Sequence, residues 1–311
     1  MSTTEQRTAV LLMAYGTPRT REDILPYYTD IRRGNAPTPE ALADLTARYD
    51  ALGGTSPLAA RTEAQRDALQ RALDEATPGT YHVMLGLKHA HPKIEEAVDQ
   101  LAAAGFRRIV GLVLAPHFSS FSVGQYLDRA RAAAEPHGIT VSGIESWATE
   151  PAFVDFVADD LRARLDALPA DTKVLFTAHS LPQRIINAGD RYPDELRSTA
   201  EAVAQAVGLD QWTGWSIAWQ SAGRTPEPWL GPDILTVIDD IAAAEHGDAH
   251  PRGVLVSAVG FVADHLEVLY DLDIEASARA AGHGLAFART ACVNDDATVM
   301  AALARRVIEA S

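Results

Sequence analysis

The sequence predicts an α/β fold of two similar doubly wound domains, each with a parallel four-stranded sheet flanked by helices. The first observation is a set of eight short apolar runs, which fall four and four along the chain. The second is that helical patterns separate these runs, as expected for parallel strands joined by crossovers. The third is the length of 311 residues, which suffices for two domains. We expect the chemistry at the carboxyl ends of the strands, in a cleft between the domains.

The predicted strands are short apolar runs bounded by polar, Gly or Pro residues. They cover residues 8–14, 81–87, 108–114, 139–144, 173–178, 215–220, 253–259 and 285–290. The predicted helices repeat apolar residues every three or four positions. They cover residues 39–50, 62–75, 94–104, 153–168, 194–207, 234–244 and 296–310. The last helix starts near two aspartates and ends near Arg305 and Arg306, which matches the preference of a helix dipole.

The joint between the domains is predicted within residues 151–171, because the fifth strand follows directly. We take residues 1–160 as the N-terminal α/β domain and residues 161–311 as the C-terminal α/β domain. The final helix could pack on the first domain, which would blur this boundary.

Composition and charge exclude several classes of protein. A formal net charge of -15 argues against nucleic acid as a partner and against nonspecific attraction to anionic membranes. No apolar stretch approaches the roughly 20 residues that span a bilayer, and no signal peptide is present, so we expect a cytoplasmic protein. The single cysteine, Cys292, excludes a disulfide within the chain and an iron–sulfur cluster held by four cysteines. We interpret Cys292 as a small buried residue.

Two distant segments indicate a metal-handling site. Residues 177–182 (TAHSLP) and residues 260–275 each follow a run that reads as a buried parallel strand. Their placement at strand ends would bring His179 and Glu267 together. An imidazole beside a carboxylate could bind a metal, accept a proton, or do both in turn, whereas a lone histidine in a loop is commonly bonded to backbone.

The second segment also carries three carboxylates at four-residue spacing. Glu267, Asp271 and Glu275 would line one face of a helix, where like charges at this spacing cost about 0.2–0.5 kcal/mol per pair. Such a stripe either faces open water or holds a cation. Its start beside Asp264 and His265, just after a strand end, favours the cation.

Other apparent motifs have simpler interpretations. Gly34, Gly53 and Gly54 do not belong to a phosphate-binding glycine pattern that follows a strand, so we reject nucleotide binding. His89 and His91 resemble a metal pair, but we interpret them as structural or exposed because no acidic residue follows before Glu95.

The order of motifs along nearly the whole chain resembles that of the ferrochelatases, most closely those that insert ferrous iron into coproporphyrin III. The matching segments lie at residues 11–18 (LLMAYGTP), 31–34 (IRRG), 48–49 (RY), 53–58 (GGTSPL), 114–122 (LAPHFSSFS), 177–182 (TAHSLP), 219–221 (WQS), 228–232 (PWLGP) and 260–275. Many protoporphyrin-using relatives carry an apolar residue in place of Tyr15, so this tyrosine indicates coproporphyrin.

This resemblance implies a lyase of haem biosynthesis with ferrous iron as co-substrate and no organic cofactor. Some ferrochelatases carry an iron–sulfur cluster held by four cysteines, which the single cysteine of this chain excludes. It implies that His179 and Glu267 are catalytic and face the metal. Asp271 and Glu275 would pass iron or protons, or hold a second hydrated cation such as magnesium. Residues predicted to bind the porphyrin are Tyr15, Arg32, Arg48, Tyr49, Ser56 and Tyr126, with Tyr15 contacting iron and the others holding propionates.

We expect a monomer whose partners are coproporphyrin III and ferrous iron, with no integral membrane segment. Three alternatives remain from the sequence: a protoporphyrin IX ferrochelatase, insertion of cobalt or nickel into another tetrapyrrole, and a non-catalytic porphyrin or haem carrier. Retention of both His179 and Glu267 argues against the carrier.

Overall fold

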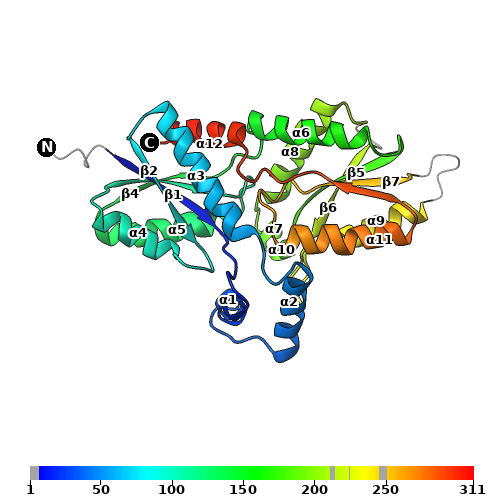
Figure 1. Cartoon of the computed structure of the whole chain (residues 1–311), viewed down its shortest axis with the longest axis horizontal. Helices are drawn as coiled ribbons and strands as arrows, with labels where there is room; N and C mark the ends of the chain where they lie inside the picture. The colour runs from blue at the N-terminus through cyan, green and yellow to red at the C-terminus, as the bar shows by residue number, and fades with distance from the viewer. Residues whose placement is uncertain (1–6, 211–213, 224, 245–250) are drawn as a thin grey trace. The chain divides into compact units, whose positions relative to one another are not determined.

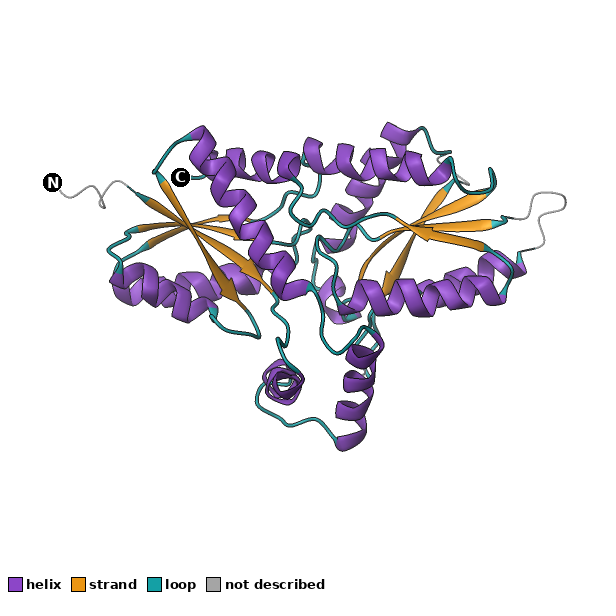
Figure 2. Cartoon of the chain, viewed as in Figure 1, coloured by secondary structure: helices purple, strands orange, loops and turns teal. Residues whose placement is uncertain are grey.

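The computed structural model describes residues 7–210, 214–223, 225–244 and 251–311 of the chain. Its helices and strands form two compact units (Figures 1 and 2). Of the described residues, the first unit comprises those within 7–147, 263–265 and 294–311, and the second comprises those within 148–262 and 266–293. The domain limits near residue 160 stay predictions. The same holds for the expectation that the N-terminal domain contacts the porphyrin propionates and the C-terminal domain handles the metal and protons.

The first unit contains a parallel sheet of strand order β2-β1-β3-β4. Its strands are β1 (Thr8–Ala14), β2 (Tyr81–Leu87), β3 (Arg108–Val113) and β4 (Thr140–Ile144). Its helices are α1 (Ile24–Ile31), α2 (Pro39–Ala51), α3 (Leu58–Ala76), α4 (Ile94–Ala103), α5 (Val123–Ala134) and α12 (Ala297–Glu309), with short 3-10 turns at Arg21–Asp23 and Glu135–His137. All seven residues of β1 are buried, as expected for a strand covered on both faces.

Helices cover both faces of this sheet (Figure 1). On one face α4 and α5 pack together, and their apolar stripes join the sheet around Leu11, Met13, Leu101 and Leu127. On the other face α12 packs against α3. Two bonds tie these helices into the unit: Gln65 donates to the carbonyl of Asn294 at 3.0 Å, and the hydroxyls of Tyr81 and Ser311 lie 2.9 Å apart.

The second unit repeats this arrangement with the strand order β6-β5-β7-β8, also parallel. Its strands are β5 (Thr172–His179), β6 (Trp215–Gln220), β7 (Gly253–Ser257) and β8 (Ala286–Arg289). Its helices are α6 (Pro151–Leu165), α7 (Gln183–Asn187), α8 (Tyr192–Val207), α9 (Ile234–Ala243), α10 (Leu266–Val268), the π-helix η4 (Leu269–Ala276) and α11 (Ser277–Gly282). The predicted fold class is therefore confirmed.

Local signals in the sequence fix where several helices begin. The Thr38 hydroxyl accepts a bond from the amide of Ala41, and Pro39 occupies the first turn of α2. At the start of α12, the Asp296 carboxylate accepts bonds from the amides of Thr298 and Val299, both at 3.0 Å. Within the part of the chain that the structure describes, no helix combines the length and the apolar composition that spanning a bilayer requires.

Candidate active site

The second unit brings His179 and Glu267 together. His179 is the last residue of β5, and Glu267 lies in α10, which follows β7. Their side chains approach to 3.6 Å between Nε2 and Oε1, and each remains about one-third exposed (34% and 37%). The predicted pairing of these two residues is therefore present in the structure, while their roles stay predictions.

The tautomer of His179 follows from its second ring nitrogen. Nδ1 lies 2.5 Å from the carbonyl oxygen of Ser180, which can only accept, so Nδ1 carries a proton and Nε2 faces Glu267. Burial alone would lower the pKa of His179, but the Glu267 carboxylate, the Ser180 carbonyl and the nearby Asp271 together raise it. The raised pKa makes Nε2 a stronger base, so this nitrogen can take up a proton that is released beside it.

Hydrogen bonds hold the backbone around this pair. Thr177 donates to the side-chain oxygen of Gln220 at 2.8 Å, and Gln220 donates its amide to the carbonyl of Glu267 at 2.9 Å. The hydroxyl of Tyr192 donates to the carbonyl of His179 at 3.1 Å. Gln220 thus connects the ends of β5 and β6 to α10. No role was predicted for Gln220 from the sequence, although it lies in the WQS motif.

The acidic stripe differs from a simple helical face. Asp271 and Glu275 lie in the π-helix η4, whose backbone bonds join residues five apart, whereas Glu267 precedes it in α10. Asp271 is 7% exposed, and the Ser221 hydroxyl donates to it at 2.5 Å. Ser221 adopts a left-handed backbone conformation (φ 59°). Among the described residues, no three His, Cys, Asp or Glu side chains form a group that could hold a metal. The roles of Asp271 and Glu275 stay predictions.

The residues predicted to bind the porphyrin all lie in the first unit. Tyr15 follows β1, is 43% exposed, and has its ring centroid 4.5 Å from that of His89. Arg32 closes α1, with its guanidinium carbon 5.8 Å from the centre of the Tyr28 ring. Arg48 lies on α2, 3.5 Å from Asp44. These three side chains are at least partly exposed.

The three predicted hydroxyl donors are more buried than the arginines. Tyr49 lies 3.4 Å from the hydroxyl of Thr17, and Ser56 accepts a bond from the amide of Leu58. Tyr126 is 4% exposed on α5. Burial, reinforced by Tyr15, raises the pKa of Tyr126 above its ordinary value, so its phenol keeps its proton and can donate.

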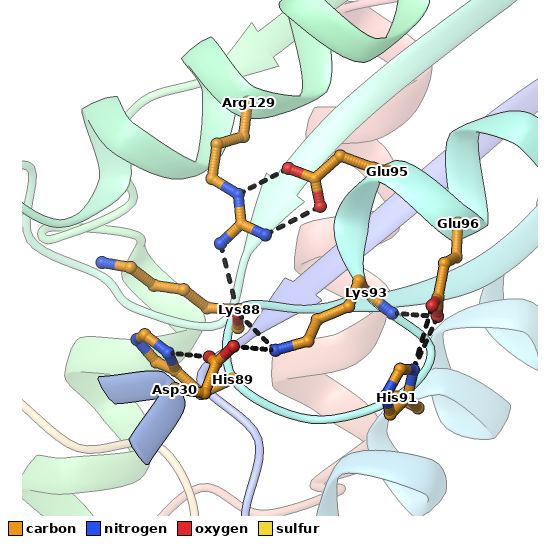
Figure 3. Close-up of polar contacts among 8 residues, drawn as sticks. All are labelled: Asp30, Lys88, His89, His91, Lys93, Glu95, Glu96 and Arg129. Atoms are coloured by element: carbon orange, nitrogen blue, oxygen red, sulfur yellow. Dashed lines mark hydrogen bonds and ion pairs between the residues drawn. The ribbon is translucent and has the colours of Figure 1, made fainter. Parts of the chain in front are cut away.

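His89 and His91 do not share a partner (Figure 3). His89 lies 2.7 Å from Asp30, and His91 lies 2.9 Å from Glu96. The side chain of His91 is 77% exposed. Burial lowers the pKa of His89 to about 4, although Asp30 opposes this shift. The two histidines are therefore bonded to separate carboxylates, in line with the structural interpretation.

A cavity of about 590 Å³ lies elsewhere in the second unit, between α8 and β6. It is lined by Trp215, Trp219, Arg197 and Pro232 among others, and neither His179 nor Glu267 contributes to it. Trp219 is thus a buried wall of this cavity, whereas the ring of Trp229 lies 6.5 Å from that of His179. The chemistry of the histidine–carboxylate pair is separate from the cavity.

Close backbone approach explains one glycine beside the pair. A Cβ placed on Gly260 would lie 2.3 Å from the Cβ and 2.6 Å from the Cα of Ala178. We expect Gly260→Ala to lower the free energy of unfolding by about 1–3 kcal/mol, because backbone must shift. Denaturant unfolding measures this change. Gly282→Ala is the matched control, since nothing lies within 4 Å of a Cβ there. Equal stability of both variants would contradict the expectation.

The family model described as "Ferrochelatase" matches residues 7–311. A protein named "Coproporphyrin III ferrochelatase" from Halalkalibacterium halodurans is 45% identical over 276 residues, covering 88% of this chain and 87% of that protein. The protein of that name from Bacillus subtilis is 41% identical over 310 residues and 98% of each chain. A "Ferrochelatase" from Herpetosiphon aurantiacus is 43% identical over 296 residues, 93% of this chain and 94% of that protein.

Two solved structures share the fold. SirB from Bacillus subtilis with Fe3+ aligns with a TM-score of 0.56 at 12% identity, covering 98% of this chain and 95% of that one. CbiX, described as the terminal enzyme of sirohaem biosynthesis in denitrifying bacteria, aligns with a TM-score of 0.53 at 13% identity, covering 98% and 99%. These two structures have the same fold as this chain but little sequence identity with it. The family model, by contrast, matches residues 7–311, so the chain belongs to the ferrochelatase family.

Proposed function

We propose that the protein inserts ferrous iron into coproporphyrin III to give iron coproporphyrin, as a lyase of haem biosynthesis. The observation that carries this proposal is the His179–Glu267 pair, with Nε2 and Oε1 3.6 Å apart at the carboxyl end of β5. Family membership supports ferrous iron and a porphyrin as substrates. The names of relatives that are 41–45% identical support coproporphyrin III as that porphyrin.

The reaction releases two protons. Two pyrrole N–H groups each lose a proton while four nitrogens bind the ferrous ion, so the products are the metallated porphyrin and two H⁺. In the proposed mechanism, His179 Nε2 and the Glu267 carboxylate face the incoming metal and take up these protons. The Ser180 carbonyl supports this role because it holds the proton of Nδ1 and directs the basic nitrogen toward Glu267.

Asp271 and Glu275 extend this site within η4. We assign to them the passage of iron or protons, or the binding of a second hydrated cation such as magnesium. The bond from Ser221 to Asp271 supports the assignment because it fixes a nearly buried carboxylate close enough to influence His179.

The first unit would hold the porphyrin. Tyr15 would contact the iron, since its phenol is exposed directly after β1. Arg32 and Arg48 would pair with propionates by charge-assisted bonds, and Tyr49, Ser56 and Tyr126 would donate hydroxyl bonds. We also propose that the protein is a monomer and that it works in the cytoplasm.

The test is to mix anaerobic ferrous iron with coproporphyrin III or protoporphyrin IX and to follow the absorbance change on metallation. We expect coproporphyrin to react at least about tenfold faster, a difference of about 1.4 kcal/mol in activation free energy. In Tyr15→Met the preference should shrink. Preference of the native protein for protoporphyrin would contradict the substrate assignment, and no turnover of either porphyrin would favour a carrier.

A further inference from the structure

Three cationic side chains lie around the loop that follows β2, and they differ in their partners (Figure 3). Arg129 makes a two-bond pair with the Glu95 carboxylate, with both distances 2.7 Å. Lys93 lies 2.9 Å from a carboxylate oxygen of Asp30. Lys88, by contrast, forms no ion pair with any described residue of the chain. The first two cations are therefore neutralised by the protein and the third is not.

The ammonium group of Lys88 has only neutral partners. It donates to the side-chain oxygen of Gln125 at 2.9 Å and lies 5.2 Å from the centre of the Tyr126 ring. In Figure 3 its side chain extends away from Asp30 and Glu95, the two carboxylates that serve the neighbouring cations. All three cations lie close together in the fold. Lys88 differs from the other two because its side chain points away from these carboxylates.

The main chain at Lys88 is held firmly. Its amide donates to the carbonyl of Ala14 at 2.9 Å, next to the end of β1. Its carbonyl accepts bonds from Arg129 at 3.2 Å and Lys93 at 3.4 Å. The paired cations therefore fix the backbone from which the unpaired one projects. Such a group is preorganised, since its position does not depend on a ligand.

The surroundings make a charge on Lys88 costly without an anion. Burial, followed by the positive charges of Arg129 and Arg33, lowers its pKa to about 8. The carboxylates nearby are already bonded, Asp30 to Lys93 and His89 and Glu95 to Arg129. A half-buried cation beside two further cations gains most from a carboxylate supplied by a ligand.

We propose that Lys88 is a further substrate anchor, which binds one propionate of the porphyrin beside Tyr126. This inference rests on the proposed function and adds a cation to the two arginines and three hydroxyls already assigned. The ligand chemistry is a carboxylate on a flat macrocycle. The ammonium would pair with that carboxylate while the Tyr126 phenol donates a second bond.

The test is an equilibrium titration of metal-free coproporphyrin III, followed by porphyrin fluorescence at pH 7. Lys88→Met should weaken binding about tenfold, because a charged hydrogen bond is lost. Lys88→Arg keeps the charge and should bind within about twofold of the native protein. The matched control is Lys173→Met at the start of β5, which removes the same charge from another half-buried lysine. Native-like binding by Lys88→Met, or equal weakening by Lys173→Met, would overturn the proposal.

A pH series separates a charge effect from a general loss of packing. The native protein should bind coproporphyrin more weakly as pH rises through about 8, because the free Lys88 then loses its proton. Of the groups around it, Arg33 and Arg129 stay charged, Tyr126 stays neutral because its pKa is raised, and His89 is already neutral. Lys93, Asp30 and Glu95 remain in their pairs.

Lys88→Arg should lack this weakening, and its persistence in that variant would contradict the inference. The titration contains no iron, so its result does not depend on metal insertion. A native protein that binds coproporphyrin through Lys88 but fails to metallate it would refute the proposed activity and leave the anchor intact. The reverse result, insertion with no effect of Lys88, would refute only the anchor.

Discussion

Replacing His179 by Ala is expected to reduce iron insertion by about 10³-fold or more, because the variant loses both a metal-facing nitrogen and a proton acceptor. The imidazole is the group that faces Glu267 from the end of β5. Its ring lies 6.5 Å from those of Trp229 and Phe261, so truncation leaves aromatic side chains in place. Initial rates of metallation measure the loss.

Binding of metal-free coproporphyrin should survive this change to within a few-fold, since the predicted propionate contacts lie in other residues. His283→Ala is the control: this histidine also faces a carboxylate, Asp239 at 2.8 Å, but lies outside the proposed site. Unchanged insertion by His179→Ala would refute the assignment of this residue, and loss of porphyrin binding would show that its role is in binding.

The second large effect is expected for Glu267→Gln, which keeps the size of the side chain and removes its charge. Iron insertion should fall about 10²-fold or more, because an amide cannot accept a pyrrole proton or pair with a ferrous ion. Loss of the carboxylate should also lower the pKa of His179, since Glu267 is the main influence that raises it against burial.

The direction of the pKa shift of His179 can be measured separately from iron insertion. In the native protein, His179 should lose its proton above its ordinary pKa of about 6.5, and in Glu267→Gln it should do so at lower pH. Titration of the imidazole signals by NMR measures both values. Asp273→Asn is the control on η4, because that carboxylate pairs with Arg289. An unchanged His179 titration in Glu267→Gln would contradict the coupling.

All eight strands of the described residues coincide with predicted apolar runs, because buried parallel strands are short apolar runs whose ends are marked by polar and Gly or Pro residues. The juxtaposition of His179 and Glu267 followed from the same reasoning, since the segments after β5 and β7 meet at one edge of their sheet. The strands and the histidine–carboxylate pair could be predicted because they depend on local sequence patterns and on the order of parallel strands.

The features that the sequence did not predict depend on tertiary detail. Four-residue spacing of carboxylates suits an α-helix, and side-chain pattern does not encode the altered backbone bonds of η4. The left-handed backbone of Ser221 also could not be predicted from the sequence, because serine does not favour that conformation. Lys93 pairs with Asp30 of α1, whereas Lys88 donates to the neutral Gln125 of α5. The local sequence around the two lysines does not predict this difference, because both partners come from distant helices.

The shared strand order of the two sheets has an evolutionary consequence. In both sheets the first strand along the chain lies between the second and the third, so β1 and β5 occupy the same architectural position. His179 ends β5, and Tyr15 follows the last residue of β1. Two of the residues proposed to contact iron thus come from one repeated position. If the halves descend from a duplicated ancestor, this position diverged to an imidazole in one copy and a phenol in the other.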